Sequence, residues 1–171
     1  MERIRLTHIT DDYFQKAWQL YDSAFPYKER RAIAQQTKIL EKENYHFDIF
    51  VNKDDLLGFI LWWDLDALRF IDHFATATAL RNKGLGKQIL RKFIGRSKKN
   101  IILEVELPSS EINRRRIKFY ERLGFILNHH HYEMPPLREG QAPLPLLLMS
   151  YPSSISLQEL DFLLKKYQQM L

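Results

Sequence analysis

The 171-residue chain is predicted to fold as an α/β protein, with helices flanking a mixed, mostly antiparallel sheet. Three observations support this fold class. Apolar residues make up 45% of the chain, enough for the core of a single domain over residues 1–171. Strand-like runs dominate the first half, and strand–helix–strand units occupy the middle. No repeat, low-complexity tract or linker interrupts this order.

The N-terminal segment predicts one strand and two helices. Residues Ile4 to His8 alternate as a strand does, and Thr10 or Asp11 is placed to cap a helix. An apolar stripe follows at helical spacing, formed by Phe14, Ala17, Trp18, Tyr21 and Phe25. Pro26 then opens a second helix, with a more broken periodicity, over about Tyr27 to Glu43.

A hairpin and a third strand are expected next. The runs Phe47 to Val51 and Leu56 to Trp63 are apolar and β-rich, and the short polar residues Asn52 to Asp55 separate them. Leu68 to Thr76 is the neighbouring strand. After it, the glycine pair Gly84 and Gly86 leads into a helix whose apolar positions recur at helical spacing.

The second half repeats the alternation of strands and helices. Ile101 to Leu107 is a short buried strand, and Pro108 to Ser110 supplies a turn and a cap for a basic helix from Glu111 to about Leu123. Gly124 is expected to end that helix in the left-handed conformation. The remaining elements are strands at Phe125 to Tyr132 and Leu146 to Tyr151, a Pro/Gly-rich loop from Met134 to Pro145, and a helix from about Ser156.

Composition excludes several kinds of chemistry. With no cysteine, the chain has no disulfide, no thiolate nucleophile and no cysteine metal ligand, so group transfer cannot pass through a cysteinyl intermediate. The net charge of +5 and the pI near 9.4 favour an anionic partner without naming it. The N-terminus lacks the apolar stretch of a signal peptide and no run is long enough to span a membrane, so a cytoplasmic protein is expected.

The segment from Arg81 to Lys87 is the sharpest functional signal. Its glycines allow close backbone approach, and the free amides and dipole of the following helix favour an anion, with basic side chains around them. A diphosphate meets these demands, although a plain tight turn is the alternative. Other phosphate-binding loops do not fit, because Gln88 stands where a P-loop has Ser or Thr and Ile89 where a dinucleotide fingerprint has glycine.

Two motifs at the right separation resemble the GCN5-related N-acetyltransferase (GNAT) family. Arg-Asn-Lys-Gly-Leu-Gly, beginning at Arg81, is similar to the Gln/Arg-x-x-Gly-x-Gly/Ala signature of that family. The stretch NRRRIKFYERLGF, from Asn113 to Phe125, is similar to its second element. The resemblance covers about Phe47 to Tyr132. It implies an acetyl-CoA-dependent N-acetyltransferase, in which an acceptor amine attacks the thioester directly within a ternary complex.

The same resemblance assigns the cofactor residues. The strand end would pair with the pantetheine arm like an added strand, and the amide of Thr76 would stabilise the developing oxyanion. Tyr120 would protonate the departing thiolate or bond the sulfur, its alternative being a half-buried core aromatic. Together the implied cofactor-binding residues are Phe74, Ala75, Thr76, Arg81, Asn82, Lys83, Gly84, Leu85, Gly86, Lys87, Asn113 and Tyr120.

The acceptor amine needs a base, because an alkyl amine is protonated at neutral pH. Strand alternation puts Asp72 on the same face as Phe74 and Thr76, which makes it the leading candidate. His73 is the substitute if a bulge exchanges the two faces. Acceptor contacts are sought at His73 as well, at Glu29, which otherwise offsets a helix dipole, and at Asp64, which is otherwise a turn residue.

Several alternatives stay open. Arg116 stands where the family usually has a small residue, and the Arg114 to Arg116 run either reaches coenzyme A phosphates or is a solvated face. A noncatalytic module that binds coenzyme A or protein is the main rival, and a basic nucleic-acid binder is less favoured because no such motif is present. His129 to His131 lacks carboxylate partners nearby, so no metal is expected. A homodimer and the identity of the acceptor are left open.

Overall fold

The computed structural model describes residues 1–171, and their contacts divide the chain into two compact units. The first unit comprises residues 1–64 and 71–98, and the second comprises residues 65–70 and 99–171. The chain enters the second unit after Asp64 and returns to the first at Ile71, within strand β4 (Leu68–Thr76), so this strand contributes residues to both.

The first unit is built on the strands β1 (Glu2–Leu6), β2 (Tyr45–Asn52), β3 (Asp55–Asp64) and β4 (Leu68–Thr76). β2 pairs antiparallel with both β1 and β3. The predicted hairpin is confirmed, because Asn52 pairs with Asp55 across the turn between β2 and β3. Lys53 adopts the left-handed conformation in that turn, with φ of 54°, which matches the twist of a short hairpin.

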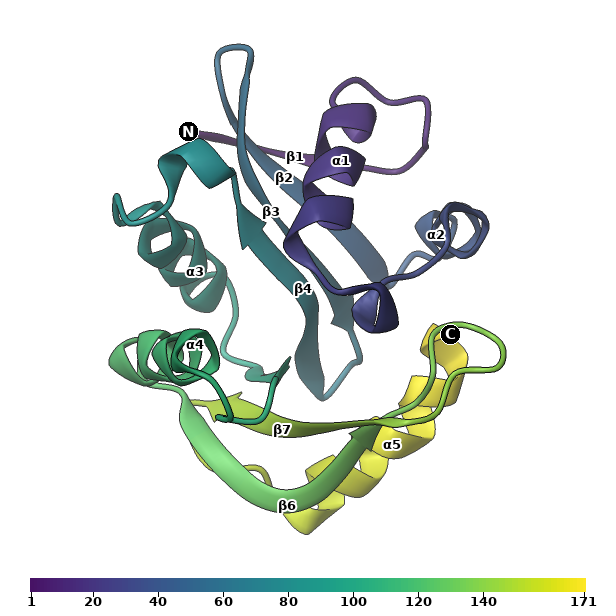
Figure 1. The fold of residues 1–171 in the computed structure, drawn as a ribbon, viewed down its shortest axis with the longest axis vertical. Helices are drawn as coiled ribbons and strands as arrows, with labels where there is room; N and C mark the ends of the chain where they lie inside the picture. Colours follow the sequence, from purple (N-terminus) through teal and green to yellow (C-terminus); the bar gives the residue numbers. More distant parts are fainter. The chain divides into compact units, whose positions relative to one another are not determined.

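Helices α1 (Phe14–Ala24) and α3 (Leu85–Gly95) cover opposite faces of this sheet (Figure 1). The ring of Tyr21 in α1 lies 6.3 Å from that of Phe59, whereas Phe93 in α3 lies 5.2 Å from Trp62. Phe59 and Trp62 are three positions apart on β3, so their side chains project from opposite faces. The predicted start of α1 is corrected: the Asp11 carboxylate accepts the Thr7 and His8 amides, and no side chain caps the helix.

The second predicted helix is two separate elements. A 3₁₀ turn, η1, covers Tyr27–Glu29, and helix α2 covers only Ile33–Leu40. Between them Arg30 and Ala32 have extended backbones, with ψ of 140° and 153°. The interruption brings the Arg31 side chain into the interior, where it is 1% exposed. A continuous helix from Tyr27 to Glu43 was therefore the wrong expectation.

In the second unit, β7 (Leu144–Tyr151) lies between β5 (Asn100–Val105) and β6 (Ile126–Met134), antiparallel to both. Helix α4 (Glu111–Arg122) begins at Ser110, whose hydroxyl accepts the Asn113 amide, as the sequence predicted. Gly124 ends it with φ of +96°. Helix α5 (Leu157–Met170) begins at Ser156, which forms a capping box with Glu159.

The three consecutive histidines interrupt the β6–β7 ladder. Asn128 pairs with Leu148 and Tyr132 pairs with Leu146, so three β6 residues between them face a single β7 residue. His129 and His131 are exposed in this bulge. β6 stands last in the strand order, and a bulge of this kind disfavours further pairing along an edge strand.

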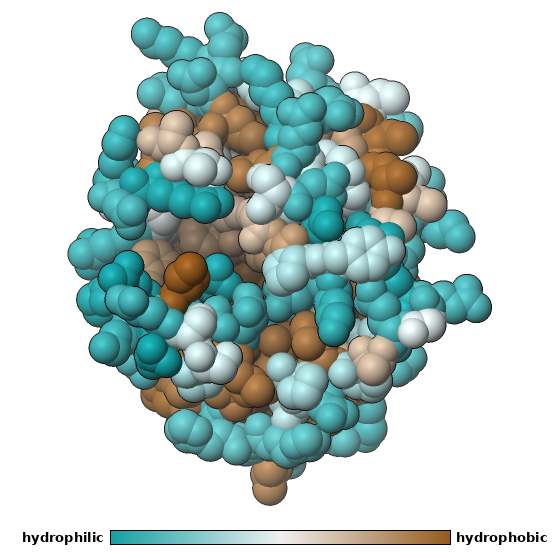
Figure 2. Space-filling model, viewed as in Figure 1, coloured by the Kyte–Doolittle hydropathy of each residue, from teal (hydrophilic) through white to brown (hydrophobic).

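The strand order β1-β2-β3-β4-β5-β7-β6 confirms the predicted fold class, a mixed and mostly antiparallel sheet flanked by helices. Large apolar side chains fill the interior of each unit; the chain's most buried ones include Phe47, Phe59, Phe70, Trp63 and Tyr167. On the face shown in Figure 2, hydrophilic side chains predominate and apolar ones emerge in patches. No helix combines the length and apolar character needed to cross a bilayer.

Candidate active site

The end of β4 is held against β3 at an unusually close approach. A Cβ built on Gly58 would lie 2.5 Å from the Ala75 carbonyl oxygen and 3.1 Å from the Thr76 Cα. The amide of Ala77 also donates to the Leu57 carbonyl at 2.8 Å. Only glycine leaves room for this contact, so Gly58 fixes where the predicted pantetheine-pairing residues end. Sequence reasoning missed Gly58, although an isolated glycine within a strand is a recognised sign of close backbone approach.

The Arg81–Lys87 segment forms the predicted turn before α3. It follows a 3₁₀ turn at Thr78–Leu80, and Asn82 and Gly84 both adopt the left-handed conformation, with φ of 63° and 76°. Gly84 is the N-cap residue of α3, and no side chain caps this helix. The first-turn amides of Leu85, Gly86 and Lys87 therefore donate no hydrogen bond to an N-cap side chain.

The charges around this helix start are all positive. Arg81, Lys83 and Lys87 are exposed, and the first turn of α3 contains no acidic residue. Natural helices usually place a carboxylate or a hydroxyl at this end, because the helix dipole is positive there. An uncapped helix start with three cations nearby is electrostatically suited to an anion with several oxygens, such as a diphosphate.

Asp72 is engaged in a buried ion pair. Its carboxylate is bonded to the guanidinium of Arg31, and their side chains are 2% and 1% exposed. The Trp63 indole donates to the same carboxylate at 3.3 Å. Burial alone would raise the pKa of Asp72, but the charge of Arg31 and the contact with His73 more than offset it, so the pKa is lowered. A carboxylate held ionised in this way is a weak proton acceptor, which disfavours the predicted role as general base.

His73, the substitute base, is also committed to bonds within the protein. Its ring is 5% exposed, with Nε2 2.6 Å from the Glu29 carbonyl oxygen and Nδ1 3.4 Å from Asp72 Oδ1. Since a carbonyl only accepts, Nε2 carries a proton and donates it there. The strict alternation that we expected does not describe these contacts, because Asp72 and His73 both reach the segment between α1 and α2.

Of the other two predicted acceptor residues, Glu29 is near β4, whereas Asp64 is far from the end of β4 at Thr76. The Glu29 backbone is bonded to His73, and its side chain is partly exposed. Asp64 ends β3 beside the turn that starts β4, with its amide donating to Asn44. A nine-residue strand separates that turn from Thr76, roughly 25 Å at the usual rise. This geometry favours the interpretation of Asp64 as a turn residue.

In the second unit, Glu106 organises the start of α4. The Asn113 side-chain amide donates to the Glu106 carboxylate at 3.2 Å and to the Leu107 carbonyl at 3.0 Å. The other Glu106 oxygen pairs with Arg116 at 3.2 Å. Arg116, which departs from the family pattern, is thus held by a carboxylate and directed to the helix surface, where 41% of its side chain is exposed.

Tyr120 is buried in α4. Its side chain is 6% exposed, and its ring packs edge-on against Phe119 and Phe125. Burial raises the pKa of Tyr120 to about 12, although the nearby charge of Arg116 lowers it in part. The phenol therefore keeps its proton at neutral pH. This state suits a hydrogen-bond donor or a general acid.

A second buried polar cluster in this unit was not predicted. The Glu104 carboxylate accepts from the Tyr132 hydroxyl at 2.7 Å and from the Tyr167 hydroxyl at 3.2 Å, and so joins β5 to β6 and α5. Burial, followed by the charge of Glu104, raises the pKa of Tyr132 strongly. Glu104, Tyr132 and Tyr167 are far apart in sequence, and no local sequence pattern predicts that they come into contact.

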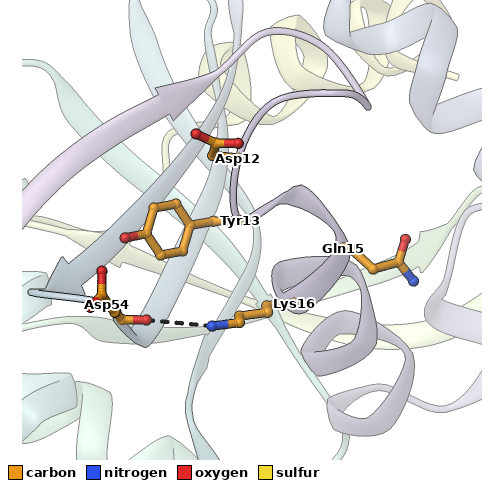
Figure 3. Close-up of a pocket in the computed structure, with 5 residues that line it drawn as sticks. All are labelled: Asp12, Tyr13, Gln15, Lys16 and Asp54. Carbon is orange, nitrogen blue, oxygen red and sulfur yellow. Dashed lines mark hydrogen bonds between the residues drawn. The ribbon is translucent and has the colours of Figure 1, made fainter.

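A surface hollow of about 400 Å³ lies elsewhere in the first unit, between the start of α1 and the β2–β3 turn (Figure 3). It is lined by Asp12, Tyr13, Gln15, Lys16 and Asp54, and contains none of the predicted site residues. Lys16 points across it to the Asp54 carbonyl at 3.4 Å (Figure 3). No group of three or more His, Cys, Asp or Glu residues is arranged to hold a metal ion.

Comparison with known proteins gives a family match over most of the chain. The family model described as acetyltransferase (GNAT) family matches residues 5–125. A solved chain from Bacteroides thetaiotaomicron, assigned to the GNAT family of acetyltransferases, is 32% identical, with a TM-score of 0.83. That similarity covers 99% of this chain and 93% of the other. No curated protein is similar enough in sequence to be matched.

Two more distant structures are similar in fold. An Escherichia coli ribosomal-protein-S18-alanine N-acetyltransferase is 17% identical, with a TM-score of 0.63, over 91% of this chain and 95% of that one. An aminoglycoside 6'-N-acetyltransferase, solved in complex with coenzyme A, is 14% identical, with a TM-score of 0.65, over 91% and 99%. At such identities the likeness concerns the fold alone.

Proposed function

Because this chain belongs to the GNAT family of acetyltransferases, which use acetyl-CoA, we propose that it transfers an acetyl group from acetyl-CoA to an amine. The acceptor would attack the thioester directly in a ternary complex, since the chain has no cysteine to carry the acyl group. One observation carries the proposal most strongly. The uncapped, cation-flanked start of α3 coincides with the segment that matches the family's pyrophosphate-binding motif.

In this proposal the Arg81–Lys87 turn binds the pyrophosphate. The first-turn amides of α3 would donate to its oxygens, and the exposed cations would lower its electrostatic energy. The backbone of Phe74 to Thr76 would then pair with the pantetheine arm, and the Thr76 amide would stabilise the negative charge that develops on the thioester carbonyl oxygen when the amine attacks its carbon. The close contact at Gly58 supports this role, because it fixes the end of β4.

Two side chains of α4 are proposed from their places in the family motif. Asn113 would contact the pantetheine arm with its amide oxygen, since its amide nitrogen already donates to Glu106 and Leu107. Tyr120 would give its proton to the departing thiolate. Its raised pKa of about 12 supports that role, because the proton is present when the thiolate leaves.

The group that accepts the proton of the acceptor amine differs from the predicted bases, Asp72 and His73. Asp72 is paired with Arg31 and His73 donates to Glu29, so we assign neither as the base. We propose instead that the amine loses its proton to water, and that Glu29 contributes negative charge for the incoming ammonium. Without a protein base, we expect the chain to prefer acceptor amines that are partly deprotonated at the working pH.

A matched pair of glycine variants tests the cofactor site. Gly84 and Gly140 both have positive φ, of 76° and 80°, and neither has an atom within 4 Å of a built Cβ. Valine would therefore strain the backbone similarly at each, but only Gly84→Val fills the space where the pyrophosphate would approach. We expect calorimetry to show at least about tenfold weaker acetyl-CoA binding for Gly84→Val, against little change for Gly140→Val.

The same proteins test the reaction. With a panel of amines, the parent chain and Gly140→Val should release free thiol from acetyl-CoA, and Gly84→Val should release much less at equal cofactor concentration. Equal affinity of the two variants for acetyl-CoA would place the pyrophosphate elsewhere. Cofactor binding without thiol release for any amine would favour the noncatalytic module instead.

A further inference from the structure

The Tyr27–Arg31 segment is anchored at its end by the buried Arg31 side chain, whereas the 3₁₀ turn before it is held mainly by polar bonds. None of the three residues of η1 is buried, and Tyr27 is 57% exposed. Within the segment, the Glu29 amide donates to the Pro26 carbonyl, the Arg30 amide donates to the Tyr27 carbonyl, and the Arg30 guanidinium lies over the Tyr27 ring. A turn with so little buried apolar surface needs other attachments to keep one position.

The attachments to neighbouring elements include the partly exposed Arg30–Asp22 ion pair at 3.0 Å and three more buried bonds, of which His73 makes the first. Its Nε2 donates to the Glu29 carbonyl at 2.6 Å. The Tyr21 hydroxyl accepts the Arg31 amide at 2.7 Å, and the Asp72 carboxylate holds the Arg31 guanidinium. Each bond joins the segment to α1 or to β4, so the segment can move only if these bonds break.

The His73 ring is itself fixed in place. It lies edge-on between the rings of Tyr21 and Phe25, with centroid separations of 4.8 and 4.7 Å and interplanar angles of 70° and 82°. The Asp72 carboxylate faces its second nitrogen. An aromatic clamp of this kind leaves the ring one orientation, in which Nε2 points at Glu29.

We propose that His73 is a positioning residue that holds the Tyr27–Arg31 segment on β4 and so sets how the acceptor amine meets the thioester. The inference rests on the proposed function, in which β4 presents the thioester and Glu29 contributes charge for the acceptor. His73 touches neither substrate in this role. It acts through the backbone of Glu29, and its loss should weaken acceptor binding while acetyl-CoA binding is kept.

Two substitutions at one position separate the tether from general packing. The amide nitrogen of glutamine reaches about as far as Nε2 of histidine, whereas that of asparagine reaches only as far as Nδ1. His73→Gln can therefore still donate to the Glu29 carbonyl, and His73→Asn cannot. Both remove the aromatic ring, so a difference between them reports the bond to Glu29.

The first readout needs no substrate. Lys28, Arg30 and Arg31 give trypsin three cleavage sites within the segment. We expect native-state cleavage there to be about tenfold faster in His73→Asn than in the parent chain, as the loss of one good hydrogen bond implies. His73→Gln should recover most of the protection. Tyr21→Phe, a milder change that removes the acceptor of the Arg31 amide, should accelerate cleavage in the same direction.

The second readout compares the KM for the acceptor amine with the KM for acetyl-CoA. With the most active amine from a panel, His73→Asn should raise the KM for that amine about tenfold and leave the KM for acetyl-CoA unchanged, and His73→Gln should restore it. Equal cleavage rates in His73→Asn and His73→Gln, or cleavage raised equally across the whole chain, would overturn the inference. Failure of the proposed function would look different, because acetyl-CoA would then not stabilise even the parent chain.

Discussion

Asp72 shows how the environment of a single side chain changes its chemical role. Asp72 lies in β4, the strand predicted over Leu68 to Thr76, and was expected to act as a base. The structure adds Arg31, 41 positions earlier, as its buried partner. No sequence pattern predicted this pair, because the extended backbone that carries Arg31 inward lies in a segment whose periodicity indicated a helix.

The buried Asp72–Arg31 ion pair should contribute to the stability of the fold. Asp72→Asn removes the carboxylate and leaves the Arg31 guanidinium buried without a counter-charge, which should lower the free energy of unfolding by about 3–5 kcal/mol. Chemical denaturation at pH 7 measures this change. Asp22→Asn is the control, because the Asp22–Arg30 pair is partly exposed and its loss should cost about 1 kcal/mol or less.

The pH dependence has a definite sign. Because the pKa of Asp72 is lowered in the folded state, its contribution to stability is present above the unfolded pKa of about 4 and is lost as the pH falls towards the folded value. The parent chain should therefore lose stability between about pH 4 and the acid limit more steeply than Asp72→Asn. Parallel curves in that range would contradict the assignment.

Substitution of Tyr120 should affect turnover rather than stability or cofactor binding. Tyr120→Phe keeps the ring and its packing against Phe125 but removes the proton that the thiolate is proposed to take. We expect kcat to fall about 100-fold, with the Kd for acetyl-CoA changed less than twofold. Stopped-time thiol assays and calorimetry measure the two quantities. Tyr151→Phe, which also alters a ring beside Phe125, should leave kcat intact.

Among the elements, those with strong local signals were predicted and those set by distant contacts were not. The β2–β3 hairpin, the Ser110 cap of α4 and the Gly124 stop each follow from residues adjacent in sequence. The division of η1 from α2 follows instead from the burial of Arg31. Gly58 was missed, and although an isolated glycine in a strand is a sign of close approach, it does not indicate which strand approaches.

Gly58 brings together β3 and the end of β4, the strand that would present the thioester, so its substitution should affect both stability and turnover. Its Cβ would lie 2.5 Å from a backbone oxygen, which cannot rotate away as a side chain would, so Gly58→Ala must displace the end of β4. We expect a loss of about 1–3 kcal/mol in stability and a larger relative fall in kcat than in acetyl-CoA affinity.

A second glycine supplies the control for that experiment. Gly95, the last residue of α3, has no atom within 4 Å of a built Cβ, so alanine fits there without displacement. Gly95→Ala should leave kcat unchanged and should not lower stability. Denaturation curves and initial rates for the two alanine variants provide the comparison. A Gly58→Ala protein as stable and active as Gly95→Ala would show that β4 does not depend on this contact.

For the whole molecule, composition predicted the class of partner only coarsely. The charge of +5 fits a nucleotide-like cofactor and a nucleic acid equally well. The fold and the family match favour the cofactor, because the cations with a specific arrangement are those around the uncapped helix start. The division into two compact units was not expected from the sequence, since no linker composition marks the points where the chain passes between them.

Binding of a cofactor and binding of a nucleic acid depend differently on ligand concentration and on salt. A cofactor that binds only the folded chain should raise the melting temperature as its concentration rises, by roughly 5–10 °C at 100 times its Kd. Nucleic-acid binding through scattered surface cations would instead appear as oligonucleotide retention that falls steeply with salt. We expect acetyl-CoA to raise the melting temperature in this way. We expect little retention of an oligonucleotide of about 20 nucleotides at about 150 mM salt, because most weak surface contacts are screened there. Strong retention at that salt, together with a melting temperature unmoved by acetyl-CoA, would mean that the basic surface rather than the α3 turn determines what this protein binds.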